Sequence, residues 1–262
     1  MLHIIVCVKQ VPDTAEVRID PATGTMVREG VKSTINPFDE NAVEAALTLR
    51  EQQGGKVSAL SMGIPSAVEQ LRHVLAMGAD EAVLLSDRAL GGADTLATAY
   101  TLSMAIRKMG DFDLILCGRQ AIDGDTAQVG PGIAERLGIP QITYAREIQV
   151  QDRVVRVKRM LEDGYEVVEA DLPALVTVVK QINEPRYPSV RGLLAAKKKD
   201  IPVWSGSDVG ADLDRTGRAG SPTRVIRTWT PSHERQAEML GSDGEAVDRL
   251  VERLREIGVL PA

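Results

Sequence analysis

The segment that covers residues 118–130 reads GRQAIDGDTAQVG and offers the clearest arrangement for binding chemistry in this chain. It follows an apolar run at residues 112–117 and leads into a helical pattern at residues 126–137. A loop between a parallel strand and a helix lies at the carboxyl edge of an open α/β sheet, where ligands bind. The first N–H groups of such a helix face an anion with the helix dipole behind them. The segment therefore indicates a phosphate-binding loop, with an ordinary strand-to-helix connection as the open alternative.

Individual residues of this loop have plausible roles in such a site. Gly124 and Ala127 are small enough for the backbone to approach a phosphate closely, and either Asp125 or Thr126 can cap the helix. Asp123 and Asp125 are paired carboxylates, but two aspartates in a turn more often brace it than perform acid–base chemistry. The loop matches neither GxGxxG nor a P-loop. The backbone groups expected to face the anion belong to the following residues: Thr126, Ala127, Gln128 and Val129.

Three further segments are expected at the same edge of the sheet. Residues 8–10 follow the first apolar run, residues 61–65 follow the second, and Asn36 is placed to cap a helix that begins at Pro37. Because parallel strands end at one edge, these segments would converge on a nucleotide-sized cleft, with the backbone of Cys7 and Met62 holding a base. Taken singly, each segment is better explained by a structural role.

The elements that must position these residues alternate between strands and helices. Continuous apolar runs predict buried parallel strands, at residues 4–8, 57–62, 82–85, 112–117 and 175–179. Helical patterns lie between them, at residues 37–53, 65–77, 93–109 and 126–137. Residues 154–158 and 165–169 predict an antiparallel hairpin. This order predicts an α/β fold with a doubly wound, mostly parallel sheet.

The character of the chain changes after residue 188. Residues 200–245 show little periodicity, and they contain both tryptophans, Trp204 and Trp229. The chain then ends in an amphipathic helix with an apolar stripe, at residues 247–257. We therefore expect a nucleotide-binding domain over residues 1–188 and a C-terminal arm over residues 189–262. The final helix packs either on its own domain or across a subunit interface, and the pattern favours neither.

Composition excludes several classes of function. Lys and Arg number 31 against 37 Asp and Glu, a net charge of −6, which disfavours nucleic acid as a partner. No run reaches the ~18 apolar residues of a membrane helix, and the N-terminus lacks signal-peptide features, so a cytoplasmic protein is expected. Cys7 and Cys117 lie in apolar runs and are expected to be reduced and buried. No metal site and no nucleophile with a histidine partner is evident, so any chemistry comes from a cofactor or a partner.

Several segments together resemble the β subunit of electron transfer flavoproteins, over essentially the whole chain. The segments that carry the resemblance are residues 35–39 (INPFD), 75–80 (LAMGAD), 118–125 (GRQAIDGD), and 172–177 (LPALVT) through 183–188 (NEPRYP). The resemblance implies a Rossmann-like domain, similar to adenine nucleotide hydrolases, in a heterodimer with an FAD-carrying α subunit. It also implies that the C-terminal arm wraps the α subunit.

The resemblance further implies roles for particular residues. Phe38 would approach the flavin of the partner, and residues 189–199 would form the recognition loop for an acyl-CoA-type dehydrogenase or a quinone oxidoreductase. The residues of that loop expected to touch the partner are Val190, Leu193, Leu194 and Lys197. The residues expected to line the nucleotide site are Cys7, Lys9, Asn36, Met62, Gly63, Gln120, Asp123, Gly124, Asp125, Thr126, Ala127, Gln128, Val129 and Gly130.

The nucleotide itself differs between members of this family. Housekeeping members hold AMP as a structural ligand, whereas bifurcating members hold a second FAD and accept electrons from NADH. Residues 11–20, 123–130 and 220–223 look like the bifurcating or nitrogen-fixation-associated type, which favours FAD over AMP. Two alternatives remain: an ATP-binding enzyme of a related adenine-nucleotide fold, and a structural subunit whose nucleotide only braces the fold.

Overall fold

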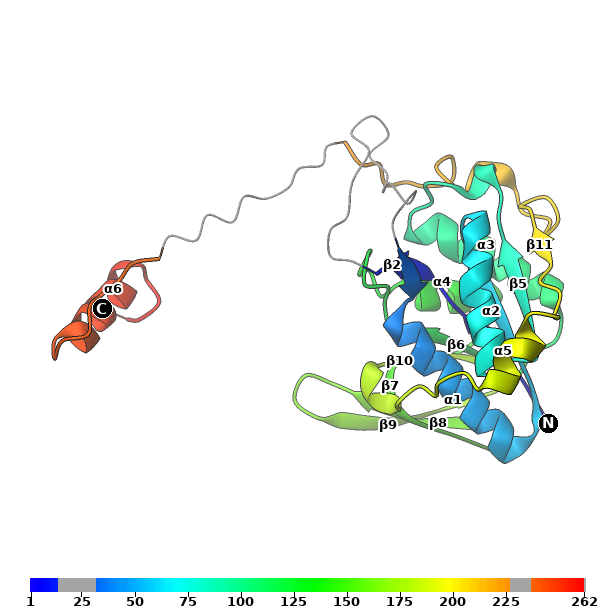
Figure 1. The fold of residues 1–262 in the computed structure, drawn as a ribbon, viewed down its shortest axis with the longest axis horizontal. Helices are drawn as coiled ribbons and strands as arrows, with labels where there is room; N and C mark the ends of the chain where they lie inside the picture. The colour runs from blue at the N-terminus through cyan, green and yellow to red at the C-terminus, as the bar shows by residue number, and fades with distance from the viewer. Residues whose placement is uncertain (14–31, 227–236, 262) are drawn as a thin grey trace. The chain divides into compact units, whose positions relative to one another are not determined.

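The computed structural model describes residues 1–13, 32–226 and 237–261, which fall into two compact units, Met1–Ile226 and Arg227–Ala262. Trp229 and most of residues 11–20 lie outside the described residues. The first unit contains a nine-stranded sheet with the order β11-β5-β4-β1-β6-β10-β7-β8-β9 (Figure 1). Its strands are β1 (Leu2–Cys7), β4 (Gly55–Met62), β5 (Glu81–Leu85), β6 (Leu114–Gly118), β7 (Gln141–Gln151), β8 (Val154–Met160), β9 (Tyr165–Asp171), β10 (Ala174–Val178) and β11 (Val203–Trp204).

Every pairing from β11 to β7 is parallel, and β8 and β9 add an antiparallel hairpin at the far edge. Helices cover both faces of this sheet. Alternate residues of β1 divide between two cores: Ile4 packs with α1 and α2, whereas Ile5 packs with α3 and α4. The doubly wound sheet predicted from the sequence is therefore confirmed. The helices of the first unit are α1 (Pro37–Gln53), α2 (Val68–Met77), α3 (Thr95–Met109), α4 (Val129–Leu137) and α5 (Val190–Ala196).

The predicted strands and helices are found, and the structure adds elements that were not predicted, among them α5 and β11. The helix α4 begins at Val129, three residues later than expected, because the chain at Asp125 and Ala127 turns through left-handed φ angles of 55° and 56°. The long strand β7 was missed, and so was a two-stranded ribbon of β2 (Gln10–Pro12) and β3 (Ser33–Ile35). Short single turns complete the unit, at Pro65–Ala67, Arg88–Leu90, Lys180–Ile182 and Leu213–Arg215.

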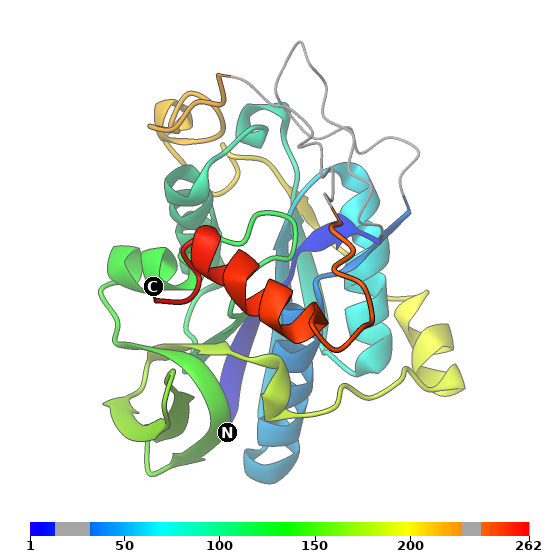
Figure 2. The ribbon, with the colours of Figure 1, turned by 90° about the vertical axis from the view of Figure 1, so that its left-hand side faces the viewer.

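The first unit extends beyond the domain boundary predicted at residue 188. The helix α5 lies beside α2, and its Ala196 is buried there (Figure 2). Further on, β11 pairs with β5, and Trp204 lies under the ammonium group of Lys108, 4.5 Å from its ring centre. Residues 189–226 therefore belong to the first unit: α5 packs on α2, and β11 extends the sheet at the edge of β5.

The second unit contains one described helix, α6 (Ala246–Glu256), as the amphipathic pattern predicted. Within the described part of this unit, no residue of the helix is buried, and Val247 is 68% exposed. None of the described helices is both long and apolar enough to cross a bilayer.

Candidate functional site

The site forms where the order of strands changes direction. After β1 the chain passes through α1 to β4 on one side, whereas β6 lies on the other side of β1. The loops leaving β1 and β6 therefore diverge to opposite faces and open a crevice, which is where ligands bind in open α/β sheets. We call the carboxyl edge of β1, β4 and β6 the rim, and residues 118–128 the rim loop.

The rim loop presents backbone donors at its tip. The N–H groups of Gly124 and Asp125 bond back to the carbonyl of Ala121, which closes a turn. Beyond it, Asp125 and Ala127 have left-handed φ angles, and Gln128 after them is right-handed; a left-handed residue next to a right-handed one is the backbone arrangement of anion-binding nests. These donors lead directly into the first turn of α4, which has no intrahelical partners for its N–H groups. The loop can therefore cradle a phosphate.

The carboxylates of the rim loop are already bound within the protein. Asp123 receives the ammonium group of Lys9 at 2.5 Å, and its side chain is only 6% exposed. The side chain of Asp125 accepts a hydrogen bond from Gln120. The ammonium group of Lys9 compensates the charge of Asp123, whereas the amide of Gln120 fixes the orientation of the Asp125 carboxylate without neutralising it. The structure thus brings Lys9 to Asp123 and Gln120 to Asp125.

The predicted caps of α4 are wrong. The N-cap position belongs to Gln128, without a side-chain hydrogen bond, so neither Asp125 nor Thr126 caps the helix. Thr126 instead accepts a hydrogen bond from the hydroxyl of Thr95 at 3.2 Å, at the start of α3. Without a side-chain cap, the first N–H groups of α4, from Val129 onward, remain for a ligand.

Asn36 occupies the N-cap position of α1, but its side chain does not cap that helix. Its amide instead donates to the carbonyl of Gln120 at 2.8 Å and accepts from the N–H of Ile122 at 3.2 Å. The side chain is buried, with 1% exposure. Asn36 therefore holds the rim loop in place, a role that the sequence pattern did not indicate.

Asp39 is the principal residue that sequence reasoning missed. It was not among the expected site residues, yet its carboxylate accepts the N–H groups of Lys9 at 2.8 Å and Gly118 at 3.1 Å. Burial raises the pKa of this carboxyl to about 7, although hydrogen bonds from Asn36, Lys9 and Gly118 act in the opposite direction. The Asn-Pro-Phe-Asp spacing at a helix start facing a strand end was the available signal.

The remaining predicted residues lie along the same edge. Cys7 and Cys117 are register partners on β1 and β6, both buried, as expected. The neighbouring Cys7 thiol and burial together raise the pKa of the Cys117 thiol, so Cys117 is a neutral thiol near pH 7. Met62 ends β4, and the N–H of Gly63 bonds to the carbonyl of Leu85.

Phe38 lies in the first turn of α1 between two cations. The guanidinium of Arg119 is 5.3 Å from the ring centre, and the ammonium group of Lys180 is 5.0 Å from it. The ring is half-buried. Phe38 therefore belongs to the rim, next to the start of the rim loop.

The recognition residues predicted on the basis of the resemblance lie on α5. Val190 and Leu194 are 75% and 60% exposed, and Leu193 and Lys197 are exposed beside them. The chain that leads to this helix is fastened to α1: Arg186 binds Glu44 at 2.8 Å and Glu51 at 2.5 Å. The residues 183–188 thus form a latch that sets where α5 begins.

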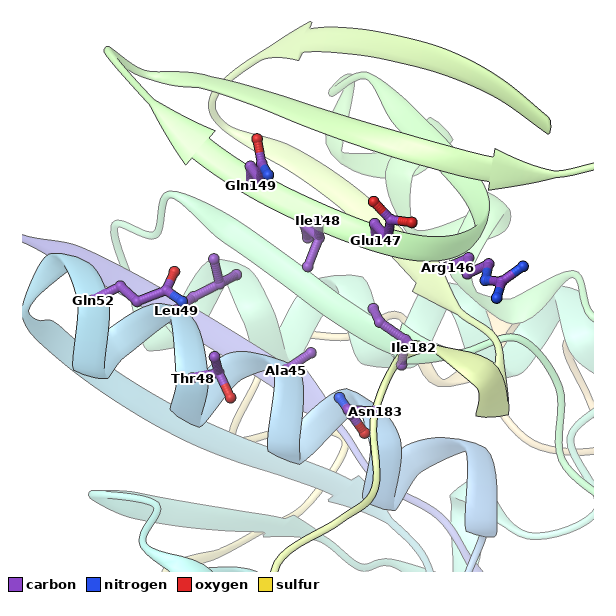
Figure 3. Close-up of a pocket in the computed structure, with 10 residues that line it drawn as sticks. All are labelled: Ala45, Thr48, Leu49, Gln52, Arg146, Glu147, Ile148, Gln149, Ile182 and Asn183. Carbon is purple, nitrogen blue, oxygen red and sulfur yellow. The ribbon is translucent and has the colours of Figure 1, made fainter.

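A separate cavity of about 280 Å³ lies between the C-terminal half of α1 and β7 (Figure 3). Its walls include Leu49 and Ile148 on facing elements and Arg146 and Asn183 at one end. None of the predicted site residues is among those that line it. It is therefore distinct from the rim.

Comparison with known proteins places this architecture in one family. The model of the electron transfer flavoprotein domain matches residues 23–209, so the chain belongs to the electron transfer flavoprotein family. It is 53% identical, over 99% of its length and all of the relative, to electron transfer flavoprotein subunit beta of Thermoanaerobacterium thermosaccharolyticum. It is 51% identical to caffeyl-CoA reductase-Etf complex subunit CarD of Acetobacterium woodii, with 97% of the chain and 98% of the relative covered. It is 48% identical to protein FixA of Azorhizobium caulinodans, with 88% and 85% covered.

The chain is thus of the β-subunit type, with a role in electron transfer. The family is associated with flavin, and its β subunits pair with an α subunit.

Proposed function

We propose that this chain is the β subunit of a bifurcating electron transfer flavoprotein, that it binds a second FAD at the rim, and that NADH supplies the electrons. The observation that carries the proposal is the rim loop, which combines left-handed φ angles at Asp125 and Ala127 with a start of α4 that has no side-chain cap, while Lys9 compensates Asp123. Similarity to a subunit of a caffeyl-CoA reductase-Etf complex and to FixA supports the bifurcating or nitrogen-fixation-associated type over the housekeeping type.

In this proposal each group at the rim has a defined task. The N–H groups of residues 126–129 hold the diphosphate, and the backbone of Cys7 and Met62 holds the adenine. Phe38 approaches the flavin of the α subunit. The exposed side chains of α5 recognise a dehydrogenase or reductase of the acyl-CoA or quinone type. FAD accepts and releases electrons when bound, and the chain itself contributes positioning.

The second unit is proposed to pack on the α subunit. Its described helix exposes Val247, Leu250 and Ile257, and an apolar stripe of this kind is stable only when something covers it. Of the arm predicted over residues 189–262, this proposal therefore keeps the second unit, because residues 189–226 belong to the first unit.

Cofactor extraction from the chain purified with its α subunit tests the proposal. Two FAD per heterodimer are expected. One FAD and one AMP would instead assign the housekeeping type. Turnover of ATP by the complex would contradict both assignments.

A further inference from the structure

The first turn of α1 holds the two chain segments that leave the sheet at the crevice. The two carboxylate oxygens of Asp39 each accept one backbone N–H, from Lys9 beyond β1 and from Gly118 at the end of β6. The backbone N–H of Asn36 also donates to the carbonyl of Lys9 at 2.9 Å. One buried carboxylate thereby joins the two sides of the crevice.

Further hydrogen bonds connect these backbone groups to the rim loop. Lys9, fixed at its N–H and its carbonyl, extends its side chain to Asp123. Asn36 holds Gln120 and Ile122, which lie between Gly118 and Asp123. Residues 118–123 are therefore held at each end and in the middle by groups that depend on the first turn of α1.

The backbone of Gly118 lies so close to Asp39 and Phe38 that no residue with a Cβ fits at this position. A Cβ at this position would lie 2.3 Å from a carboxylate oxygen of Asp39 and 2.6 Å from Cβ of Phe38. Asp39 and Gly118 thus form a matched pair, in which the absence of a side chain brings the N–H of Gly118 to the carboxylate.

We infer that Asp39 is a positioning residue of the rim: its ionised carboxylate holds the rim loop in the form that binds nucleotide, and its protonation releases that form. This inference rests on the proposed function of the rim. An ionised carboxylate accepts hydrogen bonds at both oxygens with its full charge, whereas a carboxylic acid is neutral and one of its oxygens carries a donor O–H. Protonation therefore weakens the two bonds that join Lys9 and Gly118.

The burial of Asp39 places its protonation near neutral pH. Burial raises the pKa of Asp39 to about 7, and the nearest cation, Lys9, is shared with Asp123. The charged and titratable groups on the elements around this turn are Cys7, Lys9, Glu40, Cys117, Arg119, Asp123 and Lys180. Burial also raises the pKa of Glu40 on the same turn, so Glu40 is the necessary control.

The test measures FAD binding to the full chain, with its α subunit retained, between pH 6 and pH 8. The pyrophosphate of FAD keeps its charge over this range, so the probe does not titrate. If only the ionised form of Asp39 binds, affinity falls about tenfold from pH 8 to pH 6, in proportion to the ionised fraction. Asp39→Asn is expected to weaken binding at pH 8 by about tenfold or more and to abolish the pH dependence, whereas Glu40→Gln keeps it.

Amide hydrogen exchange of the nucleotide-free wild-type protein gives a second measurement that does not depend on the variant. Corrected for intrinsic rates, protection at Lys9, Gly118 and Ile122 should fall as the pH drops through 7. Unchanged protection, or FAD affinity in the wild type that is independent of pH, would overturn the role of Asp39 while leaving the rim site intact. Absence of FAD and AMP binding at every pH, with protection that still follows pH, would contradict the proposed function but retain the grip of Asp39 on the loop.

Discussion

The ammonium group of Lys9 and the carboxylate of Asp123 lie 2.5 Å apart, although 114 positions separate them in the chain. Lys9 follows β1 and Asp123 lies in the rim loop after β6, so the pair spans the crevice at the point where the strand order reverses. The side chain of Asp123 is buried, with 6% exposed, whereas that of Lys9 is 38% exposed to solvent.

Replacement of Lys9 by Met should lower the free energy of unfolding by about 1–2 kcal/mol, because a buried carboxylate loses its cation. The loss stays below that of a fully buried pair because solvent reaches Lys9. Urea unfolding measures it. Asp123→Asn in the Lys9→Met background should recover part of the loss, and strictly additive costs would show that the two groups act independently.

Replacement of Gly124 by Leu should expel the second nucleotide and leave the flavin of the α subunit bound. A Cβ at Gly124 meets no protein atom within 4 Å, so the side chain fills the space assigned to the phosphates without disturbing the fold. Gly164→Leu is the matched control, since its Cβ is equally unobstructed in the turn between β8 and β9. Nucleotide content after gel filtration decides the result: full occupancy in the Gly124 variant would place the phosphates elsewhere.

Asp39 should make the fold less stable as the pH rises. Its pKa is raised from 3.8 to about 7 by burial, so the folded chain binds this proton more tightly than the unfolded chain does. The stability from this group is full below about pH 4 and is lost progressively up to about pH 7. Compared with Asp39→Asn, the wild type should lose up to about 2–3 kcal/mol between pH 5 and pH 8. Urea unfolding at several pH values tests this, and a constant difference between the two proteins would contradict it.

Arg186→Lys should destabilise the latch by about 2 kcal/mol, because an ammonium group cannot reproduce the fork that binds Glu44 and Glu51. Although burial alone would raise the pKa of Glu44, hydrogen bonds from Arg186 hold that pKa below its usual value. Thermal unfolding of the variant and of Arg191→Lys, on the exposed side of α5, measures the effect. Equal midpoints for the two variants would show that the latch contributes nothing.

The C-terminal unit should be sensitive to protease in the chain alone and protected in the presence of the α subunit. The exposed stripe of α6 is the reason, since it lacks a covering surface among the described residues of its own unit. Trp229→Ala is expected to weaken heterodimer formation more than it destabilises the nucleotide domain. A monodisperse monomer with a resistant tail would contradict this arrangement.

The order of strands and helices was predictable because parallel strands are buried on both faces and stand out as apolar runs. The strand β7 was not, since its exposed positions alternate with half-buried ones and no continuous run marks it. The edge strand β11 is only two residues long, so it exists through its pairing with β5 and not through a pattern of its own.

The location of the site was predictable from where strands end, but its internal contacts were not. The side-chain hydrogen bonds of Asn36 and Asp39 join positions far apart in the chain, with separations of 30 for Asp39 and Lys9, 79 for Asp39 and Gly118, and 86 for Asn36 and Ile122. Capping preferences describe neighbours along the chain, so they assigned these side chains to α1 itself. Both side chains instead form hydrogen bonds with distant segments of the chain. Capping preferences also predicted a start of α4 that is three residues too early.

The latch at residues 183–188 has a consequence for exchanging modules between related subunits. Asn183 exchanges hydrogen bonds with Asn41, and Arg186 binds Glu44 and Glu51, so the segment that leads into α5 is anchored on α1, while α5 itself packs against α2. A graft of residues 189–199 alone would inherit the host's placement of that helix. A graft that includes residues 183–199 but not α1 would lose these contacts. A chimera that is to keep the placement of α5 must therefore transfer residues 183–199 together with α1 and α2.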